Sequence, residues 1–279
     1  MRTELFAKSK KVVIKIGTST MLKDGRFDVA SVRRIAGDIV RLASLYPDKK
    51  FVIVSSGAIG MGMKILAKKT RPTSLSELQA LAALGQPELM KVFSTVFSKH
   101  NRYGCQVLLT WNDFSNRKNY LKTQKALEAM LTSRMIPIIN ENDTVATEEI
   151  EFGDNDQLSS LVALMFHADL HILLTDSNGL YSDYSQGDVS RISIVPELNS
   201  KILKWVYEAP GKHTKGGMGS KLSAIDKSLS GSIPCVLASG CHKGVLKKLF
   251  EGRDIGTVFT PKVKTMSSKK HWIANLNKC

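Results

Sequence analysis

Short apolar runs rich in β-branched residues alternate along the chain with longer segments whose apolar residues recur at helical spacing. The runs end in Gly, Ser, Thr or other polar residues, as buried parallel strands do. The pattern predicts strands at residues 12–16, 51–54, 107–109, 136–139, 172–174, 233–237 and 257–259. It predicts helices at residues 29–45, 75–97, 120–131, 157–166 and 221–229.

This alternation predicts an α/β fold with a mainly parallel sheet covered by helices on both faces, because each parallel crossover needs a connection of helix length. The chain has 279 residues and no internal repeat or Pro/Gly-rich linker. We therefore expect one continuous domain over residues 1–261. The apolar pattern fades after the last strand, so residues 262–279 are expected to form a basic C-terminal extension.

Composition narrows the class of protein. Apolar residues make up 43% of the chain and charged residues 23%, as in ordinary globular proteins. The net charge of +15 indicates an anionic partner, either nucleic acid or a small phosphorylated ligand. Because the lysines are scattered, we favour the small ligand over nucleic acid. The lysine-rich tail after Pro261, which has no acidic residue, is either a solvated tail or an anion-binding arm.

Cysteine spacing and hydropathy address the cellular location. The four cysteines are widely spaced and form no Cys-x-x-Cys pair, which favours reduced thiols over a zinc site. The polar N-terminus does not resemble a signal peptide, and no apolar run approaches the roughly 18 residues of a membrane span. We expect a cytoplasmic protein without a membrane partner.

The ends of the first two predicted strands carry candidate phosphate ligands, since ligands of open α/β sheets bind at the carboxyl ends of strands. Lys15 and Gly17 end the first strand, where a lysine adds a point charge and a glycine lets backbone approach a phosphate. A lysine on an edge strand that reaches solvent is the alternative. Ser56 and Gly57 lie in a glycine-rich stretch, residues 55–62, that forms either an anion nest or a tight turn.

Two clusters of amides and carboxylates follow further along the chain. Asn140 and Asp143 come directly after the strand at 136–139, and Asp154 and Asn155 precede a predicted helix. Taken singly, such residues are often helix caps. Together they offer acceptors for a substrate ammonium and donors for a substrate carboxylate, as recognition of a free amino acid requires.

Two further segments could hold a nucleotide. Thr175 and Asp176 begin the turn after the strand at 172–174, although its Asn-Gly pair is also common in ordinary turns. Residues 214–221 form a glycine-rich loop that leads into a helix, where backbone N–H groups and the helix dipole favour phosphate. Lys221 supplies a second lysine there.

Taken together, these segments resemble the amino-acid kinase family and, within it, the glutamate 5-kinases. The motifs that carry the resemblance are residues 13–19 (VIKIGTS), 55–59 (SSGAI), 139–143 (INEND), 153–156 (GDND), 174–176 (LTD) and 216–218 (GGM). They occur in family order between about residues 10 and 260. The resemblance implies an open αβα sandwich that transfers the γ-phosphate of ATP, with Mg²⁺, to the side-chain carboxylate of L-glutamate.

The resemblance also implies roles for individual residues. Lys15 and Lys221 would neutralise the transferring phosphoryl group, and Asp156 would orient both lysines. The residues expected to hold glutamate are Ser56, Gly57, Asn140, Asp143, Asp154 and Asn155. Those expected to hold ATP are Lys15, Gly17, Thr175, Asp176, Lys215, Gly216, Gly217, Met218, Gly219, Ser220 and Lys221. No residues are assigned to a protein-bound metal.

Two departures from the family pattern concern the ATP loop and the C-terminus. The family's Gly-Thr-Gly-Gly-Met loop begins here with Thr214 and Lys215. The C-terminal PUA domain that many members carry is expected to be absent. The family also implies homo-oligomers and feedback inhibition by proline.

Two other functions stay open from the sequence. An acetylglutamate kinase would bind a substrate without an ammonium group, which the carboxylates of Asp143 and Asp154 do not suit. An anion-binding or RNA-binding protein would exploit the positive charge and would bind RNA in a salt-sensitive way, without glutamate-dependent release of ADP.

Overall fold

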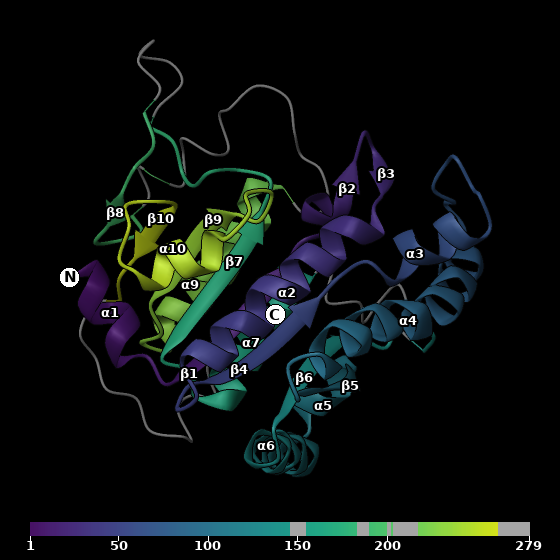
Figure 1. Cartoon of the computed structure of the whole chain (residues 1–279), viewed down its shortest axis with the longest axis horizontal. Coiled ribbons are helices and arrows are strands. Elements are labelled where there is room, and N and C mark those ends of the chain that lie inside the picture. The colour runs from purple at the N-terminus through teal and green to yellow at the C-terminus, as the bar shows by residue number, and fades with distance from the viewer. Residues whose placement is uncertain (146–154, 183–189, 200–201, 203–216, 262–279) are drawn as a thin grey trace.

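The computed structural model of the protein describes residues 1–145, 155–182, 190–199, 202 and 217–261. A twisted sheet crosses the molecule and is covered by helices (Figure 1). Its strands are β1 (Lys11–Ile16), β4 (Lys50–Ser55), β5 (Tyr103–Leu109), β6 (Met135–Glu141), β7 (Leu170–Thr175), β8 (Ile194–Val195), β9 (Cys235–Ser239) and β10 (Thr257–Phe259). They stand in the order β5-β6-β4-β1-β7-β9-β10-β8, and neighbours run parallel except for the antiparallel pair β9 and β10.

Helices lie on both faces of this sheet. They are α1 (Arg2–Lys8), α2 (Val29–Leu45), α3 (Ala58–Ile65), α4 (Leu75–Ser98), α5 (Trp111–Ser115), α6 (Arg117–Thr132), α7 (Asn155–Phe166), α9 (Met218–Ser230) and α10 (Val245–Phe250). One face, including Ile14 and Ile53, packs against α2, α4 and α10. The other face, including Val13 and Leu173, packs against α6, α7 and α9. The predicted α/β class with a mainly parallel sheet is confirmed.

The predicted elements agree closely with the observed ones. The helix predicted at 29–45 has those bounds, and its start is fixed by Asp28, whose carboxylate accepts hydrogen bonds from the backbone N–H groups of Ala30 and Ser31. Each predicted strand is present. The strand predicted at 233–237 begins only at Cys235 and continues to Ser239.

Several short elements had no counterpart in the prediction. Helices α1, α3, α5 and α10, strand β8, the 3₁₀ helix η1 (Thr18–Met21) and the hairpin of β2 (Leu22–Lys23) and β3 (Arg26–Phe27) were all unassigned. The turn of that hairpin is Asp24-Gly25, with both residues at positive φ. Asp-Gly is a known hairpin signal, so this element was accessible from the sequence.

Helices α3 and α4 approach each other through glycine. A Cβ atom added to Gly85 of α4 would lie 1.9 Å from the backbone oxygen of Ala58, and one added to Gly62 of α3 would lie 2.1 Å from the oxygen of Leu81. Real Cβ atoms essentially never come so close to backbone, so only glycine permits this packing. The contact fixes α4 against α3, the helix that follows β4.

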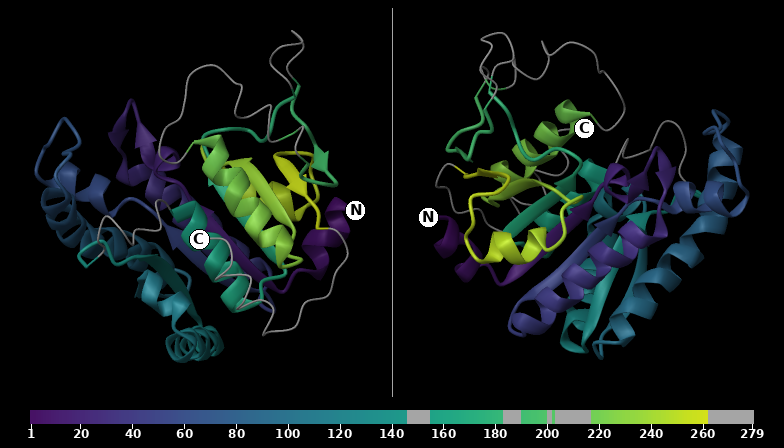
Figure 2. Two further views of the ribbon diagram at one scale, coloured as in Figure 1. Left: turned by 180° about the vertical axis from the view of Figure 1, so that it is seen from behind. Right: turned by 45° about the horizontal axis from the view of Figure 1, so that its top comes forward.

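The views in Figure 2 show how the two halves of the chain meet. From behind, α7 and α9 lie next to each other over the sheet, although about 50 residues separate them in sequence. Helix α7 also contacts β1, so the N-terminal ends of α7 and α9 lie near the end of β1. Among the described residues, no helix is long and apolar enough to cross a membrane.

Candidate active site

A cavity of about 670 Å³ opens where β1, β4 and β6 end. Its volume falls within the range of about 300–1,000 Å³ that is usual for small-molecule sites. The predicted residues that line it are Lys15, Gly17, Ser56, Gly57, Asn140, Asp143, Asn155, Asp156 and Lys221. The structure therefore brings both candidate lysines and most candidate glutamate ligands to one cavity.

The centre of the site is a buried carboxylate between two ammonium groups. Asp156, in the first turn of α7, is fully buried, and its Oδ1 lies 2.5 Å from the Nζ of Lys15. Its Oδ2 lies 3.3 Å from the Nζ of Lys221, in the first turn of α9. Two ammonium groups and one carboxylate leave one net positive charge in this cluster, which suits an anionic ligand.

Lys15 is not an edge-strand lysine. Strand β1 lies between β4 and β7 in the middle of the sheet, and Lys15 is only 5% exposed. Burying an ammonium group is costly unless a counter-charge meets it. Asp156 supplies that counter-charge, so the alternative in which Lys15 reaches solvent is excluded.

A neutral hydrogen-bond network of two serines and a histidine contacts the backbone of Asp156. The hydroxyl of Ser159 donates to the backbone oxygen of Asp156, so its oxygen must accept from Nε2–H of His171 at 2.9 Å. His171 Nδ1 then accepts from the hydroxyl of Ser228 in α9, also at 2.9 Å. The network joins α7 and α9 through β7.

Burial keeps this histidine neutral. Desolvation is the main cause that lowers the pKa of His171 to about 3, with the nearby Asp156 opposing and Lys15 reinforcing the shift. An uncharged ring with one donor and one acceptor fits the two serines on either side of it. His171 was not among the sequence-predicted residues, because a histidine inside an apolar strand gives no sign of its partners.

Two glycines form the cavity wall beside the lysines. Gly57 caps α3 with a φ of 111°, in the left-handed region that favours glycine. A side chain there would also meet Met21 and Phe27, at 2.9 and 3.0 Å. At Gly17 a Cβ would lie 3.1 Å from the oxygen of Leu174 and 3.3 Å from the Nζ of Lys15. Both positions let backbone lie close to a ligand.

The opposite wall carries amides and acids. Asn155 Nδ2 donates to the Oγ of Ser56 and to the Oδ1 of Asn140, each at 2.9 Å. Asp143 also lines this part of the cavity. Asp154 lies outside the described residues, so its place in the site stays a prediction.

Thr175 and Asp176, which were also predicted to hold the nucleotide, lie at the neighbouring strand end and are not among the residues that line the cavity. Thr175 ends β7 and donates from its hydroxyl to Asp176 at 2.8 Å. Partial desolvation opposes the ionised form of Asp176, but hydrogen bonds from Thr175, its own backbone and Ser19, with the charge of Lys221, hold its pKa below the usual value. A charged acceptor is therefore available next to the cavity.

The glycine-rich loop is described only in part. Gly217 precedes α9, and Met218, Gly219 and Ser220 form its first turn. Lys215 and Gly216 lie outside the described residues. Backbone N–H groups in the first turn of a helix are suited to phosphate, although their role as ATP ligands here stays a prediction.

Sequence reasoning missed part of the cavity lining. The additional residues include Arg71, Leu75, Leu78 and Gln79, which precede or begin α4, and Glu141, at the end of β6. Glu141 stood inside a recognised motif and was accessible from the sequence. Arg71 lies in a stretch with no predicted element, and Leu75, Leu78 and Gln79 begin the helix predicted at 75–97. Only the packing of α4 against α3 brings these residues to the cavity.

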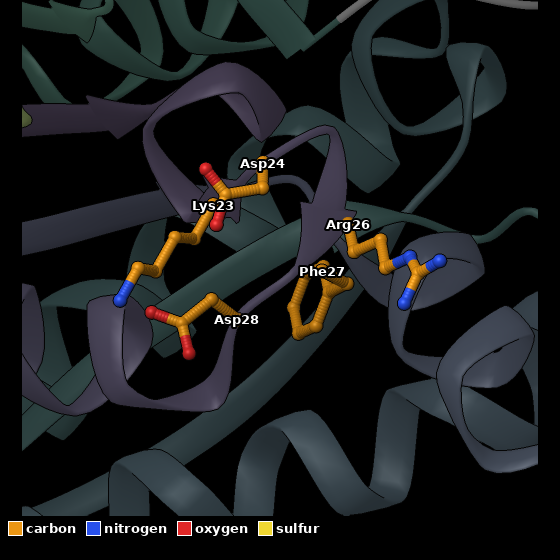
Figure 3. Close-up of a pocket in the computed structure, with 5 residues that line it drawn as sticks. All are labelled: Lys23, Asp24, Arg26, Phe27 and Asp28. Atoms are coloured by element: carbon orange, nitrogen blue, oxygen red, sulfur yellow. The ribbon is translucent and has the colours of Figure 1, made fainter.

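A second hollow, of about 450 Å³, lies beside the β2–β3 hairpin and is lined by Lys23, Asp24, Arg26, Phe27 and Asp28 (Figure 3). The ring of Phe27 packs against Gly57 and Gly60, which line the main cavity. Hydrogen bonds from Ser31 and Ala30, and the charge of Lys23, hold the pKa of Asp28 below its usual value despite some desolvation. The ring of Phe27 and the glycines Gly57 and Gly60 therefore separate this hollow from the main cavity.

The described residues offer no protein cage for a metal ion, because they contain no group of three or more His, Cys, Asp or Glu side chains arranged as ligands. Mg²⁺ is commonly bound through one or two carboxylates together with substrate phosphates.

Comparison with known proteins agrees with this geometry. The model of the amino acid kinase family matches residues 10–239. The glutamate 5-kinase of Pelobacter propionicus is 37% identical over 277 residues, which covers 98% of this chain and 74% of that protein. The glutamate 5-kinase of Moorella thermoacetica is 38% identical over 271 residues, covering 96% of this chain and 71% of that protein.

Solved structures share the fold at low sequence identity. A carbamate kinase from Giardia lamblia bound to AMP-PNP has a TM-score of 0.63 and 18% identity, and the match covers 92% of this chain and all of that one. A UMP kinase from Bacillus anthracis has a TM-score of 0.58 and 14% identity, with 91% and 97% of the two chains covered. The family match and the identity to its curated relatives agree, and this chain belongs to the amino acid kinase family.

Proposed function

We propose that the protein is a glutamate 5-kinase, which transfers the γ-phosphoryl group of ATP to the side-chain carboxylate of L-glutamate. The products are L-glutamyl 5-phosphate and ADP, and the reaction is the first step of proline biosynthesis. One observation carries this proposal: a single cavity combines a wall of amides and carboxylates, suited to a free amino acid, with a cluster of two lysines around Asp156. The similarity to curated glutamate 5-kinases supports the same function.

The chemistry requires positioning rather than a general base. The attacking carboxylate of glutamate is already ionised at neutral pH, since its usual pKa is about 4.3. The protein must align two anions that repel each other and stabilise charge on the transferring oxygens. Mg²⁺ bound to ATP would contribute further positive charge at the phosphates.

Lys15 and Lys221 are the groups proposed to meet the transferring phosphoryl group. Both approach Asp156 from different elements, β1 and α9, so the carboxylate holds the two ammonium groups at a common point. A charge that is already in place costs no reorganisation when the reaction occurs. Asp156 is accordingly proposed as the residue that orients the lysines.

Binding of the two substrates is proposed to divide between the halves of the site. Ser56, Asn140, Asp143 and Asn155 line the cavity near β4 and β6, where glutamate would bind. Thr175, Asp176 and the first turn of α9 lie at the ends of β7 and α9, where ATP would bind. The shared cluster around Asp156 lies between these groups.

Glutamate-dependent release of ADP is the direct test. Hydroxylamine in the assay traps an acyl phosphate as a hydroxamate, so the product of carboxylate phosphorylation is distinguished from plain ATP hydrolysis. Glutamate and N-acetylglutamate are compared at equal concentration. Hydroxamate formed only from N-acetylglutamate would identify an acetylglutamate kinase, and salt-sensitive RNA binding without ADP release would indicate an RNA-binding protein.

The catalytic domain is proposed to comprise residues 1–261. Strand β10 pairs with β9 and β8 and completes the sheet near that point. Deleting residues 265–279 should leave glutamate-dependent ADP release largely intact. Thermal melting and sedimentation of the shortened chain separate a structural role of the tail from a chemical one: a folded, normally assembled chain without activity would contradict the prediction.

Assembly and regulation are proposed from the family resemblance. The protein is expected to form homo-oligomers, to be inhibited by proline and to act in the cytoplasm. Sedimentation of the full chain and titration of the ADP assay with proline test the first two expectations.

A further inference from the structure

Four amide side chains form a continuous hydrogen-bonded chain from the surface to the cavity. They are Gln106 of β5, Gln86 of α4, Asn140 of β6 and Asn155 of α7, and we call this set the amide chain. The donor–acceptor distances are 2.9 Å from Asn155 to Asn140, 3.1 Å from Asn140 to Gln86 and 3.1 Å from Gln86 to Gln106. Gln86 and Asn140 are only 7% and 3% exposed, whereas Gln106 is exposed.

Every amide in the chain points the same way. The Nδ2 of Asn155 donates to Asn140, whose Nδ2 donates to Gln86, whose Nε2 donates to Gln106. The N–H groups therefore point along the chain toward Gln106, and the Nδ2 of Asn155 also donates to the Oγ of Ser56. At the cavity end the Oδ1 of Asn155 is buried and has no hydrogen-bond partner among the described residues. Most buried polar atoms have a partner, so this oxygen calls for a donor from a ligand.

The direction of the chain is a property of all four amides together. An amide turned by 180° exchanges its oxygen and its NH₂ group with little change of shape. Turning one amide alone would place two donors, or two acceptors, against each other at each neighbour. The chain thus has two consistent states, and in the reversed state Asn155 would present NH₂ where it now presents oxygen.

We propose that Gln86 and Gln106 are positioning residues that, through the direction of the amide chain, hold the oxygen of Asn155 as an acceptor for the ammonium group of an amino-acid substrate. The inference rests on the proposed function, in which that substrate is glutamate. An ammonium group donates strong, charge-assisted hydrogen bonds, whereas a carboxylate only accepts. The observed direction therefore favours a ligand with a free ammonium group, and the reversed direction favours a carboxylate.

The exposed end of the chain allows a sharp test. In Gln106→Glu the new side chain accepts only, which suits the donating Nε2 of Gln86 and keeps the observed direction. In Gln106→Lys the new side chain donates only, which favours the reversed direction. Because residue 106 is exposed, both variants should fold. Gln86→Leu interrupts the chain at its centre. The matched control is Gln124→Leu, because Gln124 lies on α6 outside the amide chain and donates a hydrogen bond to the backbone oxygen of Met165.

Binding of L-glutamate is measured by calorimetry on the full chain, together with steady-state turnover. Glutarate, which has both carboxylates but no ammonium group, serves as a second probe through its competition with glutamate. Gln106→Lys and Gln86→Leu should each weaken glutamate binding about tenfold, as loss of one hydrogen bond to a charged group does. Glutarate should bind these variants as well as the wild type or better, and KM for glutamate should rise more than kcat falls.

The sign of the effect separates the amide chain from direct electrostatics. Through space, a lysine at position 106 would attract the anionic glutamate and a glutamate side chain would repel it. The amide chain predicts the opposite order, with Gln106→Glu binding glutamate more tightly than Gln106→Lys. Gln124→Leu should leave glutamate binding unchanged.

Three results would overturn the inference. They are unchanged glutamate affinity in Gln86→Leu, equal loss of glutamate and glutarate binding, and tighter glutamate binding by Gln106→Lys than by Gln106→Glu. A wild type that binds glutamate but forms no hydroxamate would contradict the proposed function alone, since the binding comparison would still decide the role of the chain. A wild type that does not bind glutamate would contradict both.

Discussion

Asn155 and Asp156 are neighbours at the start of α7, yet they enter two different kinds of polar network. Asn155 joins the uncharged amide chain, which spans four elements and ends at exposed Gln106. Asp156 joins a compact charged cluster with Lys15 and Lys221, in which every side chain is almost completely buried. One turn of helix therefore connects a network that has direction with a network that has charge.

The difference indicates that the amide chain and the charged cluster have separate roles. Neutral amides cost little to bury when they are paired, but each bond contributes only about 0.5–1.5 kcal/mol. Buried charges are costly to desolvate, and they act strongly on a transition state that develops charge. We expect changes in the charged cluster to affect turnover and changes in the amide wall to affect glutamate binding.

Replacing a lysine of the charged cluster should have the largest effect. Lys15→Ala and Lys221→Ala should each lower kcat by about 10²–10³-fold, or roughly 2.7–4 kcal/mol, by analogy with the loss of one oxyanion donor. Glutamate affinity should change much less, because the charge acts mainly on the transition state. Steady-state kinetics and calorimetric titration of each variant provide the measurement, and near-normal turnover in both would refute the two-lysine mechanism.

A substitution of Asp143 tests whether a negative charge, in addition to the neutral amides, contributes to glutamate binding. Asp143→Asn keeps the size of the side chain and removes the negative charge that we expect to face the substrate ammonium. Glutamate binding should weaken by about 2 kcal/mol, typical for a hydrogen bond to a charged group, while KM for ATP stays close to normal. A loss of ATP affinity with unchanged glutamate binding would reverse the proposed division of the site. Asp154→Asn should act in the same direction.

His171 provides the most specific test, because its neutral network contacts the backbone of Asp156. The folded protein holds the pKa of His171 at about 3, whereas an unfolded chain has the ordinary value near 6.5. Below about pH 6.5 the unfolded chain takes up a proton that the folded protein excludes. This histidine therefore lowers the stability of the folded state by up to about 1.4 kcal/mol per pH unit as the pH falls toward 3.

Urea denaturation of the wild type and His171→Gln across pH 4–8 measures this contribution. The variant should be less stable near pH 7.5, where the wild type keeps both serine contacts, and the gap should narrow as the pH falls. A constant gap over the whole range would show that His171 does not exclude a proton in the folded state.

The fold was predictable to the extent that periodicity reports burial. Strand β1 and helix α2 matched their predicted bounds closely. Nearly all residues of β1 are buried, and α2 turns apolar residues toward the core in each of its turns. Helix α3 was missed because it is short and two of its eight residues are glycine, of which Gly62 lets α4 approach. Periodicity reports which residues are buried, but it does not report close contact between backbones.

The residues of the candidate site also differ in whether the local sequence could identify them. Lys15 was singled out because it lies near the end of a predicted strand beside Gly17, and Lys221 because it follows a glycine-rich loop that leads into a helix. The role of Asp156 between them came from the family resemblance. Gln86 gave no signal, because a glutamine beside Pro87 in the middle of a long helix has no local role. Its function depends on Asn140, 54 residues away, and such pairings come only from tertiary packing.

The glycine contacts between α3 and α4 also limit how this protein can evolve. Because backbone touches backbone at Gly62 and Gly85, α4 cannot slide or rotate along α3 without breaking that packing. Gln86, Leu78 and Gln79 all lie on this helix, so the packing of α4 fixes the positions of all three together. A lineage that acquires a new acceptor substrate would have to do so by exchanging side chains at the cavity, one substitution at a time, on a backbone that stays in place.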